Sequence, residues 1–182
     1  AAKVIKDAGS VAVFSGNGYA QIGSAIYGDV AKDYLGAAVS AGDINSDGKA
    51  DLIIGCDMIV TAGMEALAKI ANGKTALVVN NHVAPTSAFA SNPNMDFSPE
   101  KMQKALSDAA GAERAFFFPA TNWAAALFGD AIASNLFQLG FAFQKGYIPL
   151  SLDSIMRAIE MNGVAVSMNK RTFTWGRLAA VD

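Results

Sequence analysis

An acidic loop between residues 43 and 51 carries oxygen-bearing groups at alternating positions. The oxygen donors at these positions are the side chains of Asp43, Asn45, Asp47 and Asp51 and the backbone carbonyl of Lys49. Calcium takes about six to eight oxygen ligands, and alternate residues of a tightly curled loop can point inward together. The spacing therefore predicts a calcium site. The alternative is an ordinary Asx-rich turn, whose side chains bond to their own backbone.

Polar residues also follow three aliphatic stretches, at 51–55, 75–80 and 115–118, that we predict to be parallel strands. Ligands of open α/β sheets bind beyond the carboxyl ends of the strands. The residues predicted to face a cofactor or substrate there are Cys56, Asp57, Asn80, Asn81, His82, Thr121 and Asn122. No catalytic residue is assigned among them.

Two of these residues allow specific chemistry as well as a structural explanation. His82, the sole histidine, could carry a proton near neutral pH, or it could be a loop residue bonded to backbone. Cys56 could be a nucleophile, or it could be a small packed hydrophobe after a strand. A single cysteine excludes an intrachain disulfide, and one cysteine with one histidine cannot build a zinc site or an iron–sulfur cluster.

The elements that would position these residues define the fold class as α/β, with a Rossmann-like parallel sheet, flanking helices and a C-terminal helical group. We predict a helix over residues 63–70, with Met64, Leu67 and Ile70 on its buried face. A second helix starts after Ser98, with Pro99 as its first residue. After the third strand, helices are expected near 122–145, from Ser151 or Asp153 onward, and at 166–180. The buried positions predicted for the helix after Ser98 are Met102, Leu106 and Ala109. Those predicted for the helix from Ser151 or Asp153 are Ile155, Ala158 and Ile159.

The first fifty residues fit two interpretations. In the first, residues 11–14 form a strand, and Ile22, Ile26, Val30 and Tyr34 recur at a helical spacing of four residues. In the second, residues 35–41 and 51–55 form a β-hairpin around the acidic loop. A parallel neighbour at 51–55 would favour the first interpretation, and an antiparallel partner from 35–41 the second.

The second interpretation is supported by a resemblance to the FG-GAP repeat, which forms the blades of integrin-type β-propellers. The resemblance covers about residues 10–55 and rests on the segments 11–16, 28–29, 33–36, 39–42 and 43–51. It implies a structural calcium ion held by the acidic loop and favours an extracellular binding or adhesion module. A single repeat cannot close a propeller, so the segment would be a hairpin blade remnant.

From residue 50 to residue 182 the chain resembles the gamma-type domain of indolepyruvate and other 2-oxoacid:ferredoxin oxidoreductases. The segments that carry this resemblance are 50–57, 78–82 with Pro85 and Thr86, 129–135, 139–146, 160–166, 168–170 and 175–177. The family's domain begins with a strand, a Gly-rich turn and a helix. Either Gly16-Asn17-Gly18, followed by Gly23, is a shortened remnant of this unit, or the FG-GAP-like segment has replaced it. We predict two parts, residues 1–50 and 51–182, that meet at the strand 51–55.

This second resemblance implies a cytoplasmic protein that supports oxidative decarboxylation of a 2-oxoacid to an acyl-CoA, with electrons passed to ferredoxin. Thiamine diphosphate and iron–sulfur clusters would lie on other domains or subunits of the complex, so the chain alone would be inactive. A thiamine diphosphate motif would need Gly-Asp-Gly followed by an Asn. Asp47-Gly48 is preceded by Ser46 instead of glycine, and Asn80 follows Asp47 by 33 residues, so the motif is not met. The same loop already has a calcium explanation.

Charge and hydropathy narrow the range of partners. A net charge of −2 from 14 basic and 16 acidic residues offers no positive field for nucleic acid, and neither long apolar stretch reaches the length of a membrane span. The basic residues Lys170, Arg171 and Arg177 are either a solvated helix face or a docking site for acidic ferredoxin. Aromatic side chains could line an indole-sized pocket, fill the core or form a subunit interface. They are Phe116, Phe117, Phe118, Trp123, Phe128, Phe137, Phe141 and Phe143.

Overall fold

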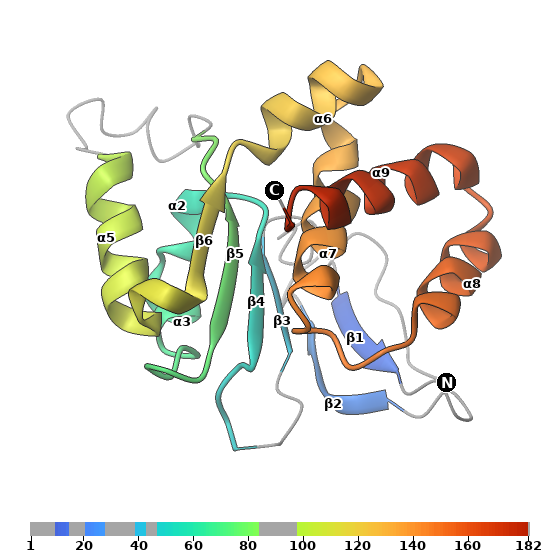
Figure 1. Ribbon diagram of the computed structural model, residues 1–182. Helices are drawn as coiled ribbons and strands as arrows, with labels where there is room; N and C mark the ends of the chain where they lie inside the picture. Colours follow the sequence, from blue (N-terminus) through green and yellow to red (C-terminus); the bar gives the residue numbers. More distant parts are fainter. Residues whose placement is uncertain (1–9, 15–20, 28–38, 43–46, 84–97, 182) are drawn as a thin grey trace.

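The computed structural model describes residues 10–14, 21–27, 39–42, 47–83 and 98–181 of the chain (Figure 1). Side chains are described for residues 47–83 and 98–181. The architecture is mixed α/β, as predicted. A four-stranded sheet with helices on both faces forms its centre, and two further helices complete the C-terminal part.

The strand order of the central sheet is β3-β4-β5-β6. β4 (Leu52–Gly55), β5 (Ala76–Asn80) and β6 (Ala115–Phe118) are parallel to one another, which confirms the three predicted strands. β3 (Val39–Gly42) pairs antiparallel with β4, with Val39 opposite Gly55. β4 therefore shows both of the outcomes named for this strand, a parallel neighbour in β5 and an antiparallel partner in β3, and the described part of that partner begins at Val39.

The described residues among the first fifty follow the hairpin interpretation. β1 (Ser10–Phe14) and β2 (Gln21–Tyr27) form a separate antiparallel pair, in which Val11 lies opposite Ile26. The prediction of a helix through Ile22 and Ile26 is wrong, because both residues belong to β2. Val30 and Tyr34 of that predicted helix lie outside the described residues.

Alternation along β4 and β5 sends side chains to two separate cores, because successive residues of a strand point to opposite faces. Ile53, Leu77 and Val79 pack on one face against α2 (Met58–Thr61) and α5 (Pro99–Ala110). Leu52, Ile54, Ala76 and Val78 pack on the other face against α7 (Ser134–Gln144). Burial of β4 and β5 on both faces explains their nearly continuous aliphatic sequences.

The helices on the first face differ partly from the prediction. Ser98 caps α5 through a hydrogen bond from the Lys101 amide, and Pro99 is its first residue, as expected. The helix predicted over 63–70 is reduced to α3 (Met64–Leu67), and Met64 is 88% exposed instead of buried. Ile70 is buried, but it lies after the end of that helix.

The helix predicted near 122–145 is interrupted. α6 (Ala120–Phe128) ends at Gly129, whose φ of 76° is left-handed, and a 3-10 turn, η2 (Ala131–Ala133), precedes α7. The side chain of Asp130 accepts a hydrogen bond from the Ile132 amide and so caps this turn. The chain therefore changes direction where the sequence suggested one continuous helix.

The C-terminal helical group consists of α8 (Leu152–Asn162) and α9 (Val166–Leu178). Ser151 caps α8, and Ile155 and Ile159 are buried as predicted, whereas Ala158 is exposed. α9 crosses α7 (Figure 1). Among the described residues, no helix combines the length and the apolar character needed to cross a bilayer.

Three members of the predicted aromatic cluster, Phe118, Phe137 and Phe141, fill the core beside α7. Phe118, at the end of β6, stacks on Trp123 with ring centroids 5.4 Å apart and also contacts Phe137 and Phe141. Phe118, Phe137 and Phe141 are each less than 10% exposed. These rings pack on one another, as expected if they belong to the core.

Candidate functional site

The carboxyl ends of the parallel strands are joined by the side chain of Asn80, the last residue of β5. Its amide nitrogen donates to the Cys56 carbonyl at 3.0 Å and to the Thr121 hydroxyl at 2.7 Å. Its amide oxygen accepts from the backbone amides of His82 and Thr121, both at 3.3 Å. Four of the seven residues predicted at this edge therefore lie together.

Asn80 uses both of its donors and its acceptor in these contacts, and the residue is only 2% exposed. The loops after β4, β5 and β6 are held in a fixed relation by this one amide. Its role in the described structure is to connect the strand ends, since none of its hydrogen-bonding groups is left over for a ligand.

The side chain of Cys56 packs against the core on the α7 side of the sheet. The side-chain nitrogen of Gln138 lies 3.6 Å from the Cys56 sulfur. Burial raises the pKa of the Cys56 thiol from 9.0 to about 11; the hydrogen bond from Gln138 opposes this shift, and the nearby charge of Asp57 adds to it. The thiol is therefore protonated at neutral pH and is a poor nucleophile.

The remaining predicted residues at this edge have separate roles. The Asp57 carboxylate caps α2 and accepts hydrogen bonds from the amides of Ile59 and Val60, at 2.8 and 3.1 Å. The Asn81 amide donates to the Phe118 carbonyl. The side chains of His82 and Asn122 are exposed. Within the described residues, the edge contains no nucleophile paired with a base.

The acidic loop lies between β3 and β4, at the opposite end of β4. Asp43 and Asn45 are outside the described residues. Asp47 accepts a hydrogen bond from the Lys49 amide at 2.9 Å, as an Asx turn requires, and its second oxygen lies 3.7 Å from the Lys74 ammonium. Gly48 has a φ of 82°, which only glycine adopts without strain.

The described part of the loop has suitable donors for calcium. Asp47 and Asp51 supply carboxylate oxygens, the ligand type that calcium prefers. The Lys49 ammonium is directed to the Ala68 carbonyl at 2.7 Å and is thus held by a group outside the loop. Over residues 47–83 and 98–181, no three acidic, histidine or cysteine side chains gather as a complete metal site. A calcium ion would need the donors of residues 43–46 as well.

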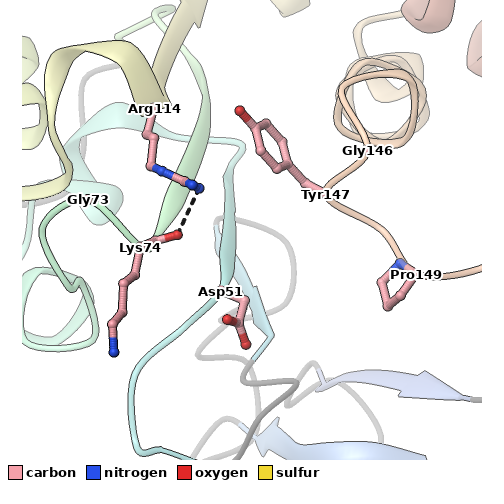
Figure 2. A pocket seen from close by; sticks show the side chains of 7 residues that line it. All are labelled: Asp51, Gly73, Lys74, Arg114, Gly146, Tyr147 and Pro149. Carbon is pink, nitrogen blue, oxygen red and sulfur yellow. Dashed lines mark hydrogen bonds between the residues drawn. The ribbon is translucent and has the colours of Figure 1, made fainter.

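A recess of about 470 Å³ lies near the acidic loop, at the amino ends of the parallel strands (Figure 2). Asp51 precedes β4, Lys74 lies just before β5, and Arg114 directly precedes β6. Tyr147 comes from the turn after α7, and its ring extends toward the side of the recess that carries Arg114 (Figure 2). The other lining residues are Gly73, Gly146 and Pro149.

Neither this recess nor the buried Gln138 was predicted from the sequence. Arg114 and Tyr147 belong to no recognisable motif, so their positions in the sequence did not indicate a site. Lys74 directly precedes a predicted strand, and attention to the amino ends of the strands would have selected it together with Asp51. For Gln138, the signal is an amide within a helix that contains no charged residue between residues 134 and 144.

The basic residues of α9 are only partly a solvated face. Lys170 lies 2.6 Å from the Glu160 carboxylate on α8, and the Arg177 guanidinium donates to the Gln144 side chain at 2.9 Å. Arg171 is exposed. Two of the three basic groups therefore connect helices, and this surface provides little free charge for an acidic partner.

Comparison with known proteins gives one match. The model of the FG-GAP repeat family matches residues 35–55, a segment that contains β3, the acidic loop and β4. No curated protein and no solved structure matches the chain. The match confirms the FG-GAP resemblance over the hairpin. The resemblance to the oxidoreductase domain has no counterpart in these comparisons and stays a prediction.

Proposed function

We propose that the chain is a calcium-dependent binding module whose ion is held by the FG-GAP-type loop at residues 43–51. The observation that supports it is the antiparallel hairpin of β3 and β4, which encloses this loop and coincides with the family match. The ligands would be Asp43, Asn45, Asp47 and Asp51 and the Lys49 carbonyl. An extracellular location would suit this function.

Calcium binding here would stabilise the junction between the hairpin and the parallel sheet. Asp51 immediately precedes β4, and the Asp51 carbonyl accepts a hydrogen bond from the Ala76 amide at the start of β5. An ion bound to Asp51 would hold the start of the two central strands as well as the loop. Binding to the folded state alone raises the melting temperature with ligand concentration.

A calcium titration of the full chain, monitored by thermal unfolding, tests this proposal. We expect the melting temperature to rise with calcium, with little response to magnesium, which tolerates this flexible geometry poorly. Asp47→Ala should abolish the rise. Asp108→Ala removes a carboxylate from the exposed face of α5, where it pairs with Lys104, and should leave the rise intact. An unchanged melting temperature in the wild-type chain would contradict the proposal.

A second proposal concerns residues 51–182 as a supporting domain of a 2-oxoacid:ferredoxin oxidoreductase. The parallel order β4-β5-β6 with helices on both faces supports it. The initial strand and helix of that family are not found in the described residues, where an antiparallel strand adjoins β4 instead. Thiamine diphosphate and iron–sulfur clusters would be held by partner subunits, and ferredoxin would accept the electrons. The isolated chain supplied with a 2-oxoacid, thiamine diphosphate, CoA and ferredoxin should show no turnover, and measurable turnover would overturn this supporting role.

A further inference from the structure

We propose that the recess at the amino ends of β4, β5 and β6 binds a small tetrahedral oxyanion, and that Asp47 and Asp51 oppose this binding until calcium engages them. The oxyanion would be sulfate or the phosphate group of a small molecule. The calcium-dependent part rests on the proposed function of the acidic loop. The anion site itself rests only on residues of the recess.

Arg114 is the principal anion-binding group. Its guanidinium donates one hydrogen bond, to the Lys74 carbonyl at 3.0 Å, and none of the described carboxylates forms an ion pair with it. A guanidinium has five donors in a planar fork that matches tetrahedral oxyanions. Most of these donors are therefore available on a partly buried side chain in the wall of the recess.

Lys74 would supply the second positive charge. Its ammonium lies 3.7 Å from the Asp47 carboxylate, and the Lys74 side chain is 70% exposed. An exposed pair at this separation is weak and exchanges readily. Because the backbone of Lys74 already lies against Arg114, a rotation of its flexible stem would bring both cations to the same anion.

The two aspartates explain why calcium should control this site. Asp47 competes for Lys74, and Asp51 lines the recess, so both carboxylates oppose an entering anion. The same two residues belong to the proposed calcium site. An ion with two positive charges would engage both carboxylates and release Lys74. Such coupling is reciprocal, so the anion would raise the affinity for calcium by the same factor.

The recess is open to solvent and has the volume of a small-molecule site. Its volume of about 470 Å³ lies within the range of small-molecule sites, which is roughly 300–1,000 Å³. Tyr147 and Pro149 provide a wall that can contact the rest of a phosphorylated compound. Sulfate is the simplest probe, and glycerol 3-phosphate tests the larger ligand.

The test is a titration of the full chain with sodium sulfate, followed by backbone amide chemical shifts, in EDTA and in calcium. We expect calcium to tighten sulfate binding by about tenfold, within the usual range of coupling between sites. In EDTA, the double variant Asp47→Asn/Asp51→Asn should bind sulfate as tightly as the wild-type chain does in calcium. Its sulfate affinity should not change when calcium is added. Glycerol 3-phosphate should shift the amides of Gly146 and Tyr147, and glycerol should not.

Variants of the cations complete the test. In the Asp47→Asn/Asp51→Asn background, Arg114→Gln should abolish sulfate binding and Arg114→Lys should weaken it. Lys74→Gln in the same background should lower the sulfate affinity to that of the wild-type chain in EDTA. Lys104→Gln, on the exposed face of α5, is the matched control and should have no effect. Amide spectra report whether each variant is folded.

Three results would separate the two proposals. If Arg114→Gln leaves sulfate binding unchanged, the anion site is overturned. If calcium raises the melting temperature but does not alter sulfate affinity, the coupling is overturned while the calcium loop stands. If calcium has no effect on the wild-type chain but the double variant still binds sulfate through Arg114, the proposed function fails and the anion site is supported.

Discussion

The amide nitrogen of Gln138 lies 3.6 Å from the sulfur of Cys56, while the amide oxygen of Gln138 has no hydrogen-bond partner in the described structure. Gln138 is completely buried in the middle of α7. An unpaired buried acceptor costs about 1–3 kcal/mol. The contact with Cys56 is a weak one, since sulfur is a poor acceptor. The weak contact with Cys56 therefore does not offset the free-energy cost of burying the Gln138 amide.

Gln138→Met should be neutral or stabilising, by up to about 1 kcal/mol, because methionine has a similar shape and leaves no unpaired oxygen. Gln144→Met is the matched control on the same helix. Its amide oxygen accepts from Arg177, so this variant should lose about 0.5–1.5 kcal/mol. Urea denaturation measures both free energies of unfolding. A loss at Gln138 larger than the loss at Gln144 would show that the buried amide has a partner.

The pKa of Cys56 makes stability depend on alkaline pH. In the unfolded chain the thiol loses its proton near pH 9.0, whereas in the folded protein it does so at about pH 11. The native state therefore binds more protons than the unfolded state between these values, and the contribution of Cys56 to stability falls as the pH rises from 9.0 to about 11. Below pH 9 that contribution is fully present.

A comparison with Cys56→Ala isolates this effect, since all other titrating groups cancel in the difference. The free energy of unfolding of the wild type relative to Cys56→Ala should be constant from pH 7 to pH 8.5 and decline toward pH 11. Urea denaturation at each pH gives this difference. A difference that stays constant across the whole range would mean that the thiol titrates alike in both states.

Two glycines allow α7 and α9 to cross closely. A methyl group on Gly140 would overlap the Phe173 carbonyl, and one on Gly176 would overlap the Phe137 carbonyl. Gly140→Ala and Gly176→Ala should each destabilise the protein by at least about 2 kcal/mol, as overpacking against backbone does. The double variant should lose less than the sum, because both changes separate the same two helices. Ser167→Ala, on the exposed side of α9, is the control and should change stability little.

The parts of the fold that the sequence predicted correctly are those with a single local solution. β4 and β5 are short aliphatic segments, and because they are buried on both faces their sequences show no alternation of apolar and polar residues. β6 was predicted from its run of three phenylalanines, and it is only partly buried. Ser98 was identifiable as a helix cap because a side-chain oxygen before a helical pattern has a specific role. For α8 the sequence left the start open between Ser151 and Asp153, and Ser151 is the residue that caps the helix.

The errors have equally local causes. Ile22 and Ile26 are four residues apart, and an even spacing places two side chains on the same face of a strand as well as of a helix. The break at Gly129 was hidden because the sequence on both sides is apolar, so periodicity gave no boundary. Met64 was expected to be buried from its spacing, but the helix it begins has only four residues.

The candidate sites show the same limit. The rule that ligands bind beyond the carboxyl ends of strands selected Asn80 and Thr121, and the structure does bring them together. Sequence could not show that Asn80 would be fully occupied in joining the loops. It could not show the recess either, because Arg114 and Tyr147 are distant in the chain and only the fold brings both to the lining of the recess.

Asn80 provides a direct test of its connecting role. Asn80→Ala would leave the Thr121 amide and the Cys56 carbonyl without their partner in a buried site and should destabilise the protein by about 2–3 kcal/mol. His82→Ala, at the exposed side chain two residues later, should change stability by less than about 0.5 kcal/mol. Thermal and urea unfolding would measure both. Equal effects of the two substitutions would contradict the assignment.

Ala165, between α8 and α9, has a φ of 45° and is the only residue other than glycine with a positive φ in the described part of the chain. The left-handed conformation costs an L-residue about 1–2 kcal/mol, and glycine avoids this cost. Ala165→Gly should therefore stabilise the protein, by about 0.5–1 kcal/mol after the greater entropy of glycine in the unfolded chain is subtracted.

The same substitution at a helical position should have the opposite sign. Ala158 is exposed in the middle of α8, where glycine is less favourable than alanine by about 1 kcal/mol. Urea denaturation of the two variants side by side gives both signs. If Ala165→Gly and Ala158→Gly destabilise the protein equally, the turn between α8 and α9 does not hold Ala165 in the left-handed region, and the strain assigned to it is absent.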